Sequence, residues 1–192
     1  MGVTLSKGGN VSLSKAAPGL ARLRIGLGWR ARATTGADFD LDASALLCAG
    51  GRVLGDEYFV FFNNLKSPEG SVEHTGDELV GGSGANDDET VLVDLTLVPA
   101  RVDKIVFSVS IYGAEERRQT FGQVAGAYIR VVNEADSAEL ARYDLTEDAS
   151  SETAMIFGEL YRHGGEWKFR AVGQGYASGL RGIALDFGVN VS

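Results

Sequence analysis

The sequence predicts an all-β protein, an antiparallel β-sandwich with one or two short helices. Several segments alternate apolar and polar residues, which is the pattern of a strand with one buried face. Glycine is abundant, with 26 residues against only 3 prolines, and glycine is typical of the turns between short strands. No linker divides the chain, and its 192 residues suffice for one hydrophobic core. We therefore expect a single domain over residues 1–192.

The predicted strands follow one another at intervals of roughly ten residues, as in a sandwich. In chain order they are Leu23–Trp29, Phe39–Leu47, Tyr58–Phe62, Val91–Leu97, Ile105–Ile111, Tyr128–Val132, Leu140–Leu145, Ala154–Tyr161 and Trp167–Ala171. Tyr58–Phe62 is apolar throughout, which favours a strand buried on both faces. The last two strands are predicted to form a hairpin that turns at His163, Gly164 and Gly165.

Two segments are predicted as helices. Ala114–Val124 begins with charged residues and has no β-branched run, which favours a helix. Ser178–Phe187 is also predicted as a helix, although Gly179 and Gly182 lower its intrinsic helix propensity.

The charge of the chain is concentrated in one stretch. The chain has 18 basic and 26 acidic residues, a net charge of −8, and no lysine or arginine lies between Lys66 and Arg101. The acids of that interval account for the whole net negative charge. They are Glu69, Glu73, Asp77, Glu78, Asp87, Asp88, Glu89 and Asp94. Nucleic-acid binding needs a basic surface, so the pattern excludes nucleic acid as the expected partner and favours a cation.

Cysteine and histidine usage argues against disulfides and catalysis. Cys48 is the single cysteine, so no internal disulfide can form, and we expect a cytoplasmic protein in which Cys48 is a packing residue. No signal peptide or apolar span of membrane length is visible. His74 and His163 have no neighbouring nucleophile, so the sequence does not predict an enzyme.

The first candidate metal segment is the start of the Phe39–Leu47 strand. Asp38, Asp40 and Asp42 alternate with apolar residues, so their carboxylates share one face with Cα atoms about 6.5–7 Å apart. One ion cannot reach all three on a straight strand, so either the chain bends or two ions share Asp40. Ala43 stands where an EF-hand loop requires glycine. The alternative to a site is a solvent-facing strand edge.

The second candidate segment is rich in glycine and acids. Carboxylate, carbonyl and amide oxygens suit Ca²⁺, which takes six to eight oxygen ligands, and no His/Cys cluster favours zinc. The candidates here, with two asparagines that follow an apolar strand, are Asn63, Asn64, Asp77, Gly81, Asp87, Asp88 and Glu89. We expect one or two Ca²⁺ ions. The alternative is a solvated acidic turn.

Several motifs in the same order resemble those of the TerD family of bacterial tellurium-resistance and stress-response proteins. They are residues 2–9, 38–44, 61–64, 76–89, 119–122 and 157–162, which read GVTLSKGG, DFDLDAS, FFNN, GDELVGGSGANDDE, QTFG and FGELYR. The resemblance covers nearly the whole chain. It implies a cytoplasmic β-sandwich that binds calcium, with a role in tellurite resistance or general stress and with other such proteins as partners.

The resemblance also implies metal-binding positions. By motif they are Asp38, Asp40, Asp42, Asp77, Asp87, Asp88 and Glu89, with Asn63 and Asn64 as the paired asparagines. Family members often carry further acids in the glycine-rich loop, whereas this chain has Ser83, Ala85 and Asn86 there. Fewer acids predict weaker binding, or one well-filled site instead of two.

Two alternative functions are open. A calcium-dependent membrane-docking module of the C2 type is one, although the predicted loops show no exposed aromatic or basic cluster that would support insertion. A scaffold for a complex of stress proteins is the other.

Overall fold

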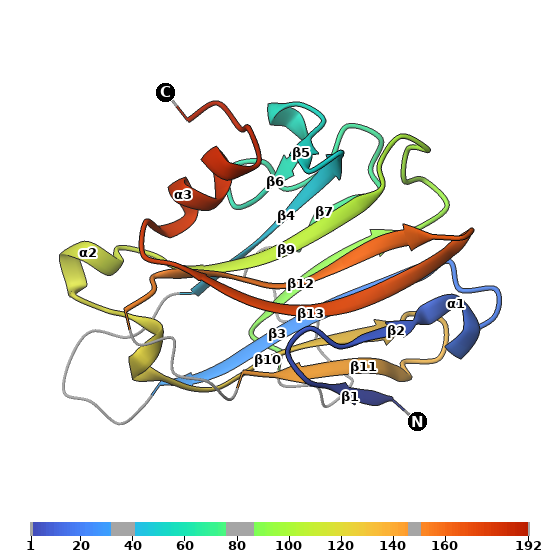
Figure 1. Ribbon diagram of the computed structural model, residues 1–192, viewed down its shortest axis with the longest axis horizontal. Coiled ribbons are helices and arrows are strands. Elements are labelled where there is room, and N and C mark those ends of the chain that lie inside the picture. The colour runs from blue at the N-terminus through green and yellow to red at the C-terminus, as the bar shows by residue number, and fades with distance from the viewer. Residues whose placement is uncertain (1, 32–40, 76–86, 146–150, 192) are drawn as a thin grey trace.

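Two sheets lie face to face in the computed structural model, which describes residues 2–31, 41–75, 87–145 and 151–191 (Figure 1). The six-stranded sheet has the order β1 (Val3–Leu5), β11 (Glu139–Asp144), β10 (Val124–Asn133), β3 (Arg22–Ala31), β8 (Glu89–Asp94) and β7 (Val72–His74). The seven-stranded sheet has the order β2 (Asn10–Ser12), β13 (Glu166–Tyr176), β12 (Ala154–His163), β9 (Lys104–Ile111), β4 (Leu41–Ala49) and β5 (Arg52–Val53), with β6 (Phe59–Val60) also paired to β4.

This architecture confirms the predicted all-β sandwich. The paired strands run antiparallel apart from β1, which pairs in parallel with β11. The helices of the described residues are α1 (Leu13–Ala16), α2 (Ala114–Arg117) and α3 (Gly179–Asp186), with single 3₁₀ turns η1 (Asp56–Tyr58) and η2 (Phe121–Gln123). None of these helices is long and apolar enough to cross a membrane.

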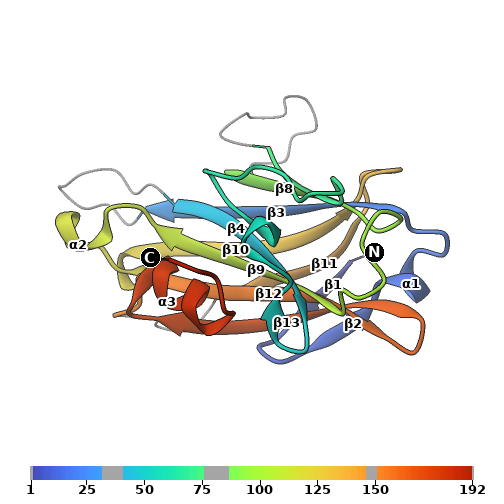
Figure 2. The same ribbon diagram turned by 90° about the horizontal axis from the view of Figure 1, so that it is seen from above.

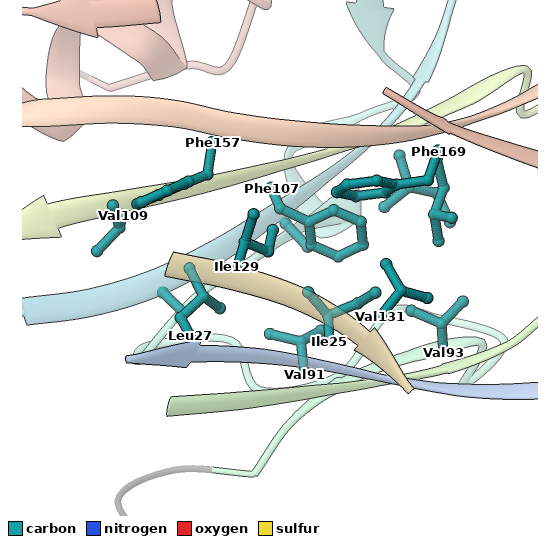
Figure 3. Close-up of a cluster of buried hydrophobic side chains, with 14 of the residues drawn as sticks. Ile25, Leu27, Val91, Val93, Phe107, Val109, Ile129, Val131, Phe157 and Phe169 are labelled. Carbon is teal, nitrogen blue, oxygen red and sulfur yellow. The ribbon is translucent and has the colours of Figure 1, made fainter. Parts of the chain in front are cut away.

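The main core lies between the two sheets, where the alternation of the strands predicts it. Ile25 and Leu27 of β3 and Val91 of β8 point from one sheet toward Phe107 and Phe157 of the other (Figure 3). Every second residue of these strands is therefore removed from water, and the burial of that apolar surface is the main favourable term in folding.

A second apolar cluster lies on the outer face of the seven-stranded sheet, where α3 covers it (Figure 1). We call it the outer apolar cluster, and its buried members are Leu46, Cys48, Phe59, Val106, Ala154, Ile156, Ile183, Ala184 and Val189. It confirms the helix predicted at Ser178–Phe187. It also confirms Cys48 as a packing residue, because the thiol is fully buried and burial raises its pKa to about 12.

Three predicted elements are wrong in extent. The predicted strand Val91–Leu97 ends at Asp94, where the Leu97 N–H donates to Asp94 O at 3.1 Å and closes a turn. The predicted strand Tyr58–Phe62 is reduced to β6, because Phe61 and Asn64 exchange backbone hydrogen bonds of 3.0 and 2.9 Å that close a tight turn. The predicted helix Ala114–Val124 stops at Arg117, because Arg118 takes a left-handed conformation with φ 51°. Non-glycine residues adopt that conformation at a cost, and it ends a helix.

Both sheets present strand ends at a shared end of the sandwich (Figure 2). We call it the crossover end and define it by Ala31, Leu41, Glu89, Ile111 and Val124. In the seven-stranded sheet Leu41 of β4 lies opposite Ile111 of β9. In the six-stranded sheet Val124 of β10 lies opposite Ala31 of β3, and β8 begins at Glu89, opposite Leu27, four residues before Ala31. The described ends of both acidic segments therefore meet the fold here.

Candidate functional site

The structure describes only part of the predicted calcium site. The candidates within the described residues are Asp42, Asn63, Asn64, Asp87, Asp88 and Glu89, and those outside them are Asp38, Asp40, Asp77 and Gly81. For the second group the assignment stays a prediction.

Asp42 lies on the face that the alternation of β4 predicts. Leu41 and Ala43 point into the main core, so Asp42 and Ser44 point to the outer face of the seven-stranded sheet. There Asp42 stands opposite Ser110, and the hydroxyls of Ser44 and Ser108 are hydrogen-bonded. Asp42 thus belongs to a polar strip on β4 and β9 at the crossover end.

Asp87 lies on the opposite side of the sandwich, on the outer face of the six-stranded sheet. Its Oδ1 accepts hydrogen bonds from the Tyr128 hydroxyl at 2.7 Å and from Arg130 Nε at 2.9 Å. Its Oδ2 accepts from Arg130 Nε at 3.0 Å and from Arg130 Nη2 at 2.7 Å. Only 5% of the Asp87 side chain is exposed. The guanidinium and the hydroxyl together compensate a nearly buried carboxylate.

Two glycines of β3 create the room for this arrangement. A Cβ atom at Gly26 would lie 2.2 Å from Asp87 Oδ2, and one at Gly28 would lie 2.4 Å from Tyr128 Cε1. Both distances are far below van der Waals contact, so the carboxylate and the phenol ring rest directly on the backbone of β3. On the far side of the ring, the Arg142 guanidinium stacks at 4.1 Å from the centroid.

The electrostatics of this cluster keep its proton donors protonated. Burial, the hydrogen bond to Asp87 and the charge of Asp87 all raise the pKa of Tyr128 above its usual range. Burial lowers the pKa of Arg130, but the hydrogen bonds and charge of Asp87 outweigh it and raise that pKa overall. Tyr128 and Arg130 therefore remain donors toward Asp87 across the physiological pH range.

Asp88 is the solvent-exposed member of the three consecutive acids. Its backbone N–H donates to Leu27 O at 2.8 Å, and its Oδ2 accepts from the Trp29 N–H at 3.0 Å. These two contacts continue the pairing of β8 with β3 by one residue beyond Glu89. They hold the Asp88 carboxylate at the crossover end with its side chain facing water.

Glu89 points into the interior between the sheets. Its Oε2 lies 3.3 Å from Nε2 of His74 on the neighbouring strand β7, and both side chains are almost fully buried. Sequence analysis missed this pair because it treats His74 as an isolated histidine. The pairing of β7 with β8, which places His74 beside Val91, brings the two together.

The paired asparagines differ in role. Asn64 Nδ2 donates to the carbonyls of Glu57 at 3.1 Å and Phe59 at 2.8 Å, so its amide fastens the turn after β6. Asn63 is exposed within that turn. The turn lies near the crossover end, because the ring of Phe62 packs edge-on against Tyr112, which directly follows β9.

The described candidates do not converge on one point. No group of three or more His, Cys, Asp or Glu side chains that could hold a metal ion occurs in residues 2–31, 41–75, 87–145 and 151–191. Asp87 fits poorly as a ligand because Arg130 and Tyr128 donate to its oxygens, and Glu89 fits poorly because it is buried between the sheets beside His74. Asp42, Asn63 and Asp88 carry oxygens of the type that calcium prefers, and they lie at the crossover end.

An exposed aromatic pair corrects one sequence-based expectation. We expected no exposed aromatic cluster in the loops, but Phe62 is 45% and Tyr112 is 54% exposed. Their ring centroids are 6.5 Å apart, and the Arg117 guanidinium lies 6.0 Å from the Tyr112 ring. The pair is thus an apolar surface with an adjacent cation.

Comparison with known proteins places these features in a family. The TerD domain profile matches residues 1–187. The chain is 62% identical to "Tellurium resistance protein TerD" of Serratia marcescens and 52% identical to "General stress protein 16U" of Bacillus subtilis, in each case over the whole of both chains. A crystal structure of a homologue of telluride resistance protein (TerD) from Streptomyces coelicolor matches in fold with a TM-score of 0.67 and 24% identity, over 86% of this chain and 96% of that one.

Proposed function

The chain belongs to the TerD domain family of tellurium-resistance and general stress proteins, and from this premise we propose that it is a cytoplasmic calcium-binding protein of that response. One or two Ca²⁺ ions would be held at the crossover end. Asp42 and Asp88 are their proposed ligands among the described residues, with Asn63 as a neutral donor. Asp38, Asp40, Asp77 and Gly81 are the proposed ligands from the remaining sequence.

One observation carries this proposal: the two acidic segments join opposite sheets at the same end of the sandwich. Asp42 is the second residue of β4 in the seven-stranded sheet, and Asp88 directly precedes β8 in the six-stranded sheet. Carboxylates gathered at one end of the sandwich repel one another, which costs folding free energy. Bound Ca²⁺ supplies the positive charge that removes this repulsion.

Calcium titration of thermal stability tests the proposal. A ligand that binds only the folded state adds about 2.7 kcal/mol at a hundred times its Kd, so we expect the melting temperature to rise with CaCl₂ and to rise much less with MgCl₂. Asp40→Ala and Asp88→Ala should reduce the response. Asp136→Ala, which removes an exposed acid that is not a candidate ligand, is the matched control. A wild-type melting temperature unchanged at millimolar calcium would overturn the proposal.

Membrane docking is the second candidate function, and the exposed pair of Phe62 and Tyr112 favours it. Aromatic side chains anchor proteins at the membrane interface, and a cation such as Arg117 attracts anionic headgroups. We expect calcium-dependent sedimentation with vesicles containing phosphatidylserine, and its loss in a Phe62→Ser/Tyr112→Ser variant. Equal sedimentation of both proteins would exclude this surface, and no sedimentation of the wild type would exclude the function.

A further inference from the structure

We propose that Asp87 is a positioning residue, anchored by Arg130 and Tyr128 to the outer face of the six-stranded sheet, and not a ligand of the ion. The part of this inference that concerns calcium rests on the proposed function. The anchor itself does not depend on it.

The contacts of Asp87 leave little room for a cation. Two donors reach each of its oxygens: Tyr128 Oη and Arg130 Nε on Oδ1, and Arg130 Nε and Nη2 on Oδ2. A carboxylate offers about four lone-pair positions, so these contacts nearly saturate it. An ion that took Asp87 would have to break a buried, two-pronged ion pair and would then face the released guanidinium of Arg130. Both changes are unfavourable.

The residues around the ion pair of Asp87 and Arg130 also favour a fixed position of Asp87. Gly26 and Gly28 let the carboxylate and the ring approach the backbone of β3. The Arg142 guanidinium closes the other side of the Tyr128 ring, and Asp144 in turn holds Arg142 with an Nη2–Oδ1 distance of 2.9 Å. Residues of β3 and β10 therefore surround Asp87, and Arg142 of β11 packs against the Tyr128 ring that holds it.

The anchor acts on its neighbour in the chain. Asp87 is tied to β10, while the next residue, Asp88, is tied to β3 through Leu27 O and the Trp29 N–H. Together these contacts fix the backbone of residues 87–88 from two sides and hold the exposed Asp88 carboxylate at the crossover end. Arg130 thereby sets the position of a proposed ligand that it does not touch.

Removing Arg130 gives opposite results under the two assignments. If Asp87 is an anchor, Arg130→Met loosens Asp88, and the calcium concentration at half-maximal thermal response should rise by about threefold or more. If Asp87 is a ligand that Arg130 competes for, the same variant should lower that concentration. Arg130→Lys keeps the charge and should restore part of the wild-type response. Arg170→Met is the matched control, because Arg170 holds Glu159 and stacks on Tyr161 on the other sheet, and it should leave the calcium midpoint unchanged.

Substitution of the two neighbouring acids provides a second readout. We expect Asp87→Asn, which breaks the same ion pair as Arg130→Met, to raise the calcium midpoint by a similar factor of about three, and Asp88→Asn to raise it tenfold or more. A loss of response in Asp87→Asn as large as in Asp88→Asn would overturn the assignment of Asp87.

A test without calcium separates failure of the anchor from failure of the proposed function. In calcium-free buffer, Asp87→Asn and Arg130→Met should each lower the melting temperature, and the double variant should fall no further than the more damaging single variant. Additive effects would overturn the anchor even if calcium binds. Non-additive effects with no calcium response in the wild type would uphold the anchor and overturn the proposed function.

Discussion

The outer faces of the two sheets are protected in different ways. On the seven-stranded sheet, α3 packs Ile183 and Ala184 into the outer apolar cluster with Leu46 and Val106, and the part of the face that this helix covers is apolar. On the six-stranded sheet, charged and aromatic side chains lie over two glycines, and the face is held by hydrogen bonds and ion pairs. On this ionic face Arg130 pairs with Asp87 at 2.7 Å and lies 3.9 Å from Glu139. Apolar packing depends on the area that is buried, whereas the pair of Asp87 and Arg130 depends on the position of one residue of the chain.

The two kinds of protection differ in how they fail. Apolar burial is proportional to the area removed from water and has no preferred direction. An ion pair with little exposure depends on geometry, and removal of one partner leaves the other charge buried without compensation. The loss of stability caused by a substitution on the apolar face should therefore scale with the side-chain volume removed. The loss caused by a substitution on the ionic face should depend on whether Asp87, Tyr128 and Arg130 keep their positions.

The largest effect is expected on the apolar face. Leu46 is fully buried in the outer apolar cluster, so Leu46→Ala should lower the free energy of unfolding by about 3 kcal/mol, the middle of the range for buried leucines. Leu97→Ala is the matched control, because Leu97 is 48% exposed, and it should change stability by no more than about 0.5 kcal/mol. Urea denaturation measures both. Similar losses in the two variants would mean that α3 does not seal this face.

A smaller loss of stability is expected from substitution of the glycines of β3 on which the side chains of the ionic face rest. A Cβ at Gly28 would lie 2.4 Å from Tyr128 Cε1, so Gly28→Ala should displace the ring and break its hydrogen bond to Asp87. A hydrogen bond to a charged group contributes about 1.5–3 kcal/mol, and we expect a loss of about 2 kcal/mol in urea denaturation.

The Tyr128→Ala background is the control for this prediction. With the ring absent, Gly28→Ala has nothing to displace, and its cost should fall to a few tenths of a kcal/mol. An undiminished cost in that background would show that Gly28 is needed for the conformation of β3 itself, and the contrast between the two faces would then rest on Gly26 alone.

Sequence periodicity predicts the sandwich but not the ionic face. The alternation of Ile25 and Leu27 with Arg24, Gly26 and Gly28 predicts a strand with one buried side, and the structure confirms it. The same alternation correctly assigns Asp42 to a polar face. From the sequence alone, however, Gly26 and Gly28 are only two positions without a side chain on the polar face of the strand. Their role becomes visible only when β10 and β8 are placed on either side of β3.

The partners of the acids are equally hidden from the sequence. Asp87 and Arg130 are 43 residues apart, and their contact depends on two separate strand registers, β3 with β8 and β3 with β10. A motif that groups Asp87, Asp88 and Glu89 suggests one shared role. The structure turns the three side chains toward an arginine, the solvent and a histidine, because Asp87 and Asp88 precede β8 and only Glu89 follows the alternation of that strand.

The smallest expected effect is the pH dependence of stability that Cys48, a residue of the outer apolar cluster, contributes. Burial among apolar side chains raises the pKa of the Cys48 thiol to about 12, with Lys104 lowering it in part and Asp103 and Glu159 raising it. An unfolded cysteine ionises near a pKa of about 8.5. The folded state thus retains its proton where the unfolded state has lost it, so this contribution to stability is complete below about pH 8.5 and declines as the pH rises toward 12. At pH 9.5 the wild type should have lost about 1.4 kcal/mol relative to its own value at pH 7, beyond any loss in Cys48→Ala. Equal pH dependence of the two proteins, together with rapid reaction of the native thiol with a disulfide reagent, would show that the face under α3 opens to solvent.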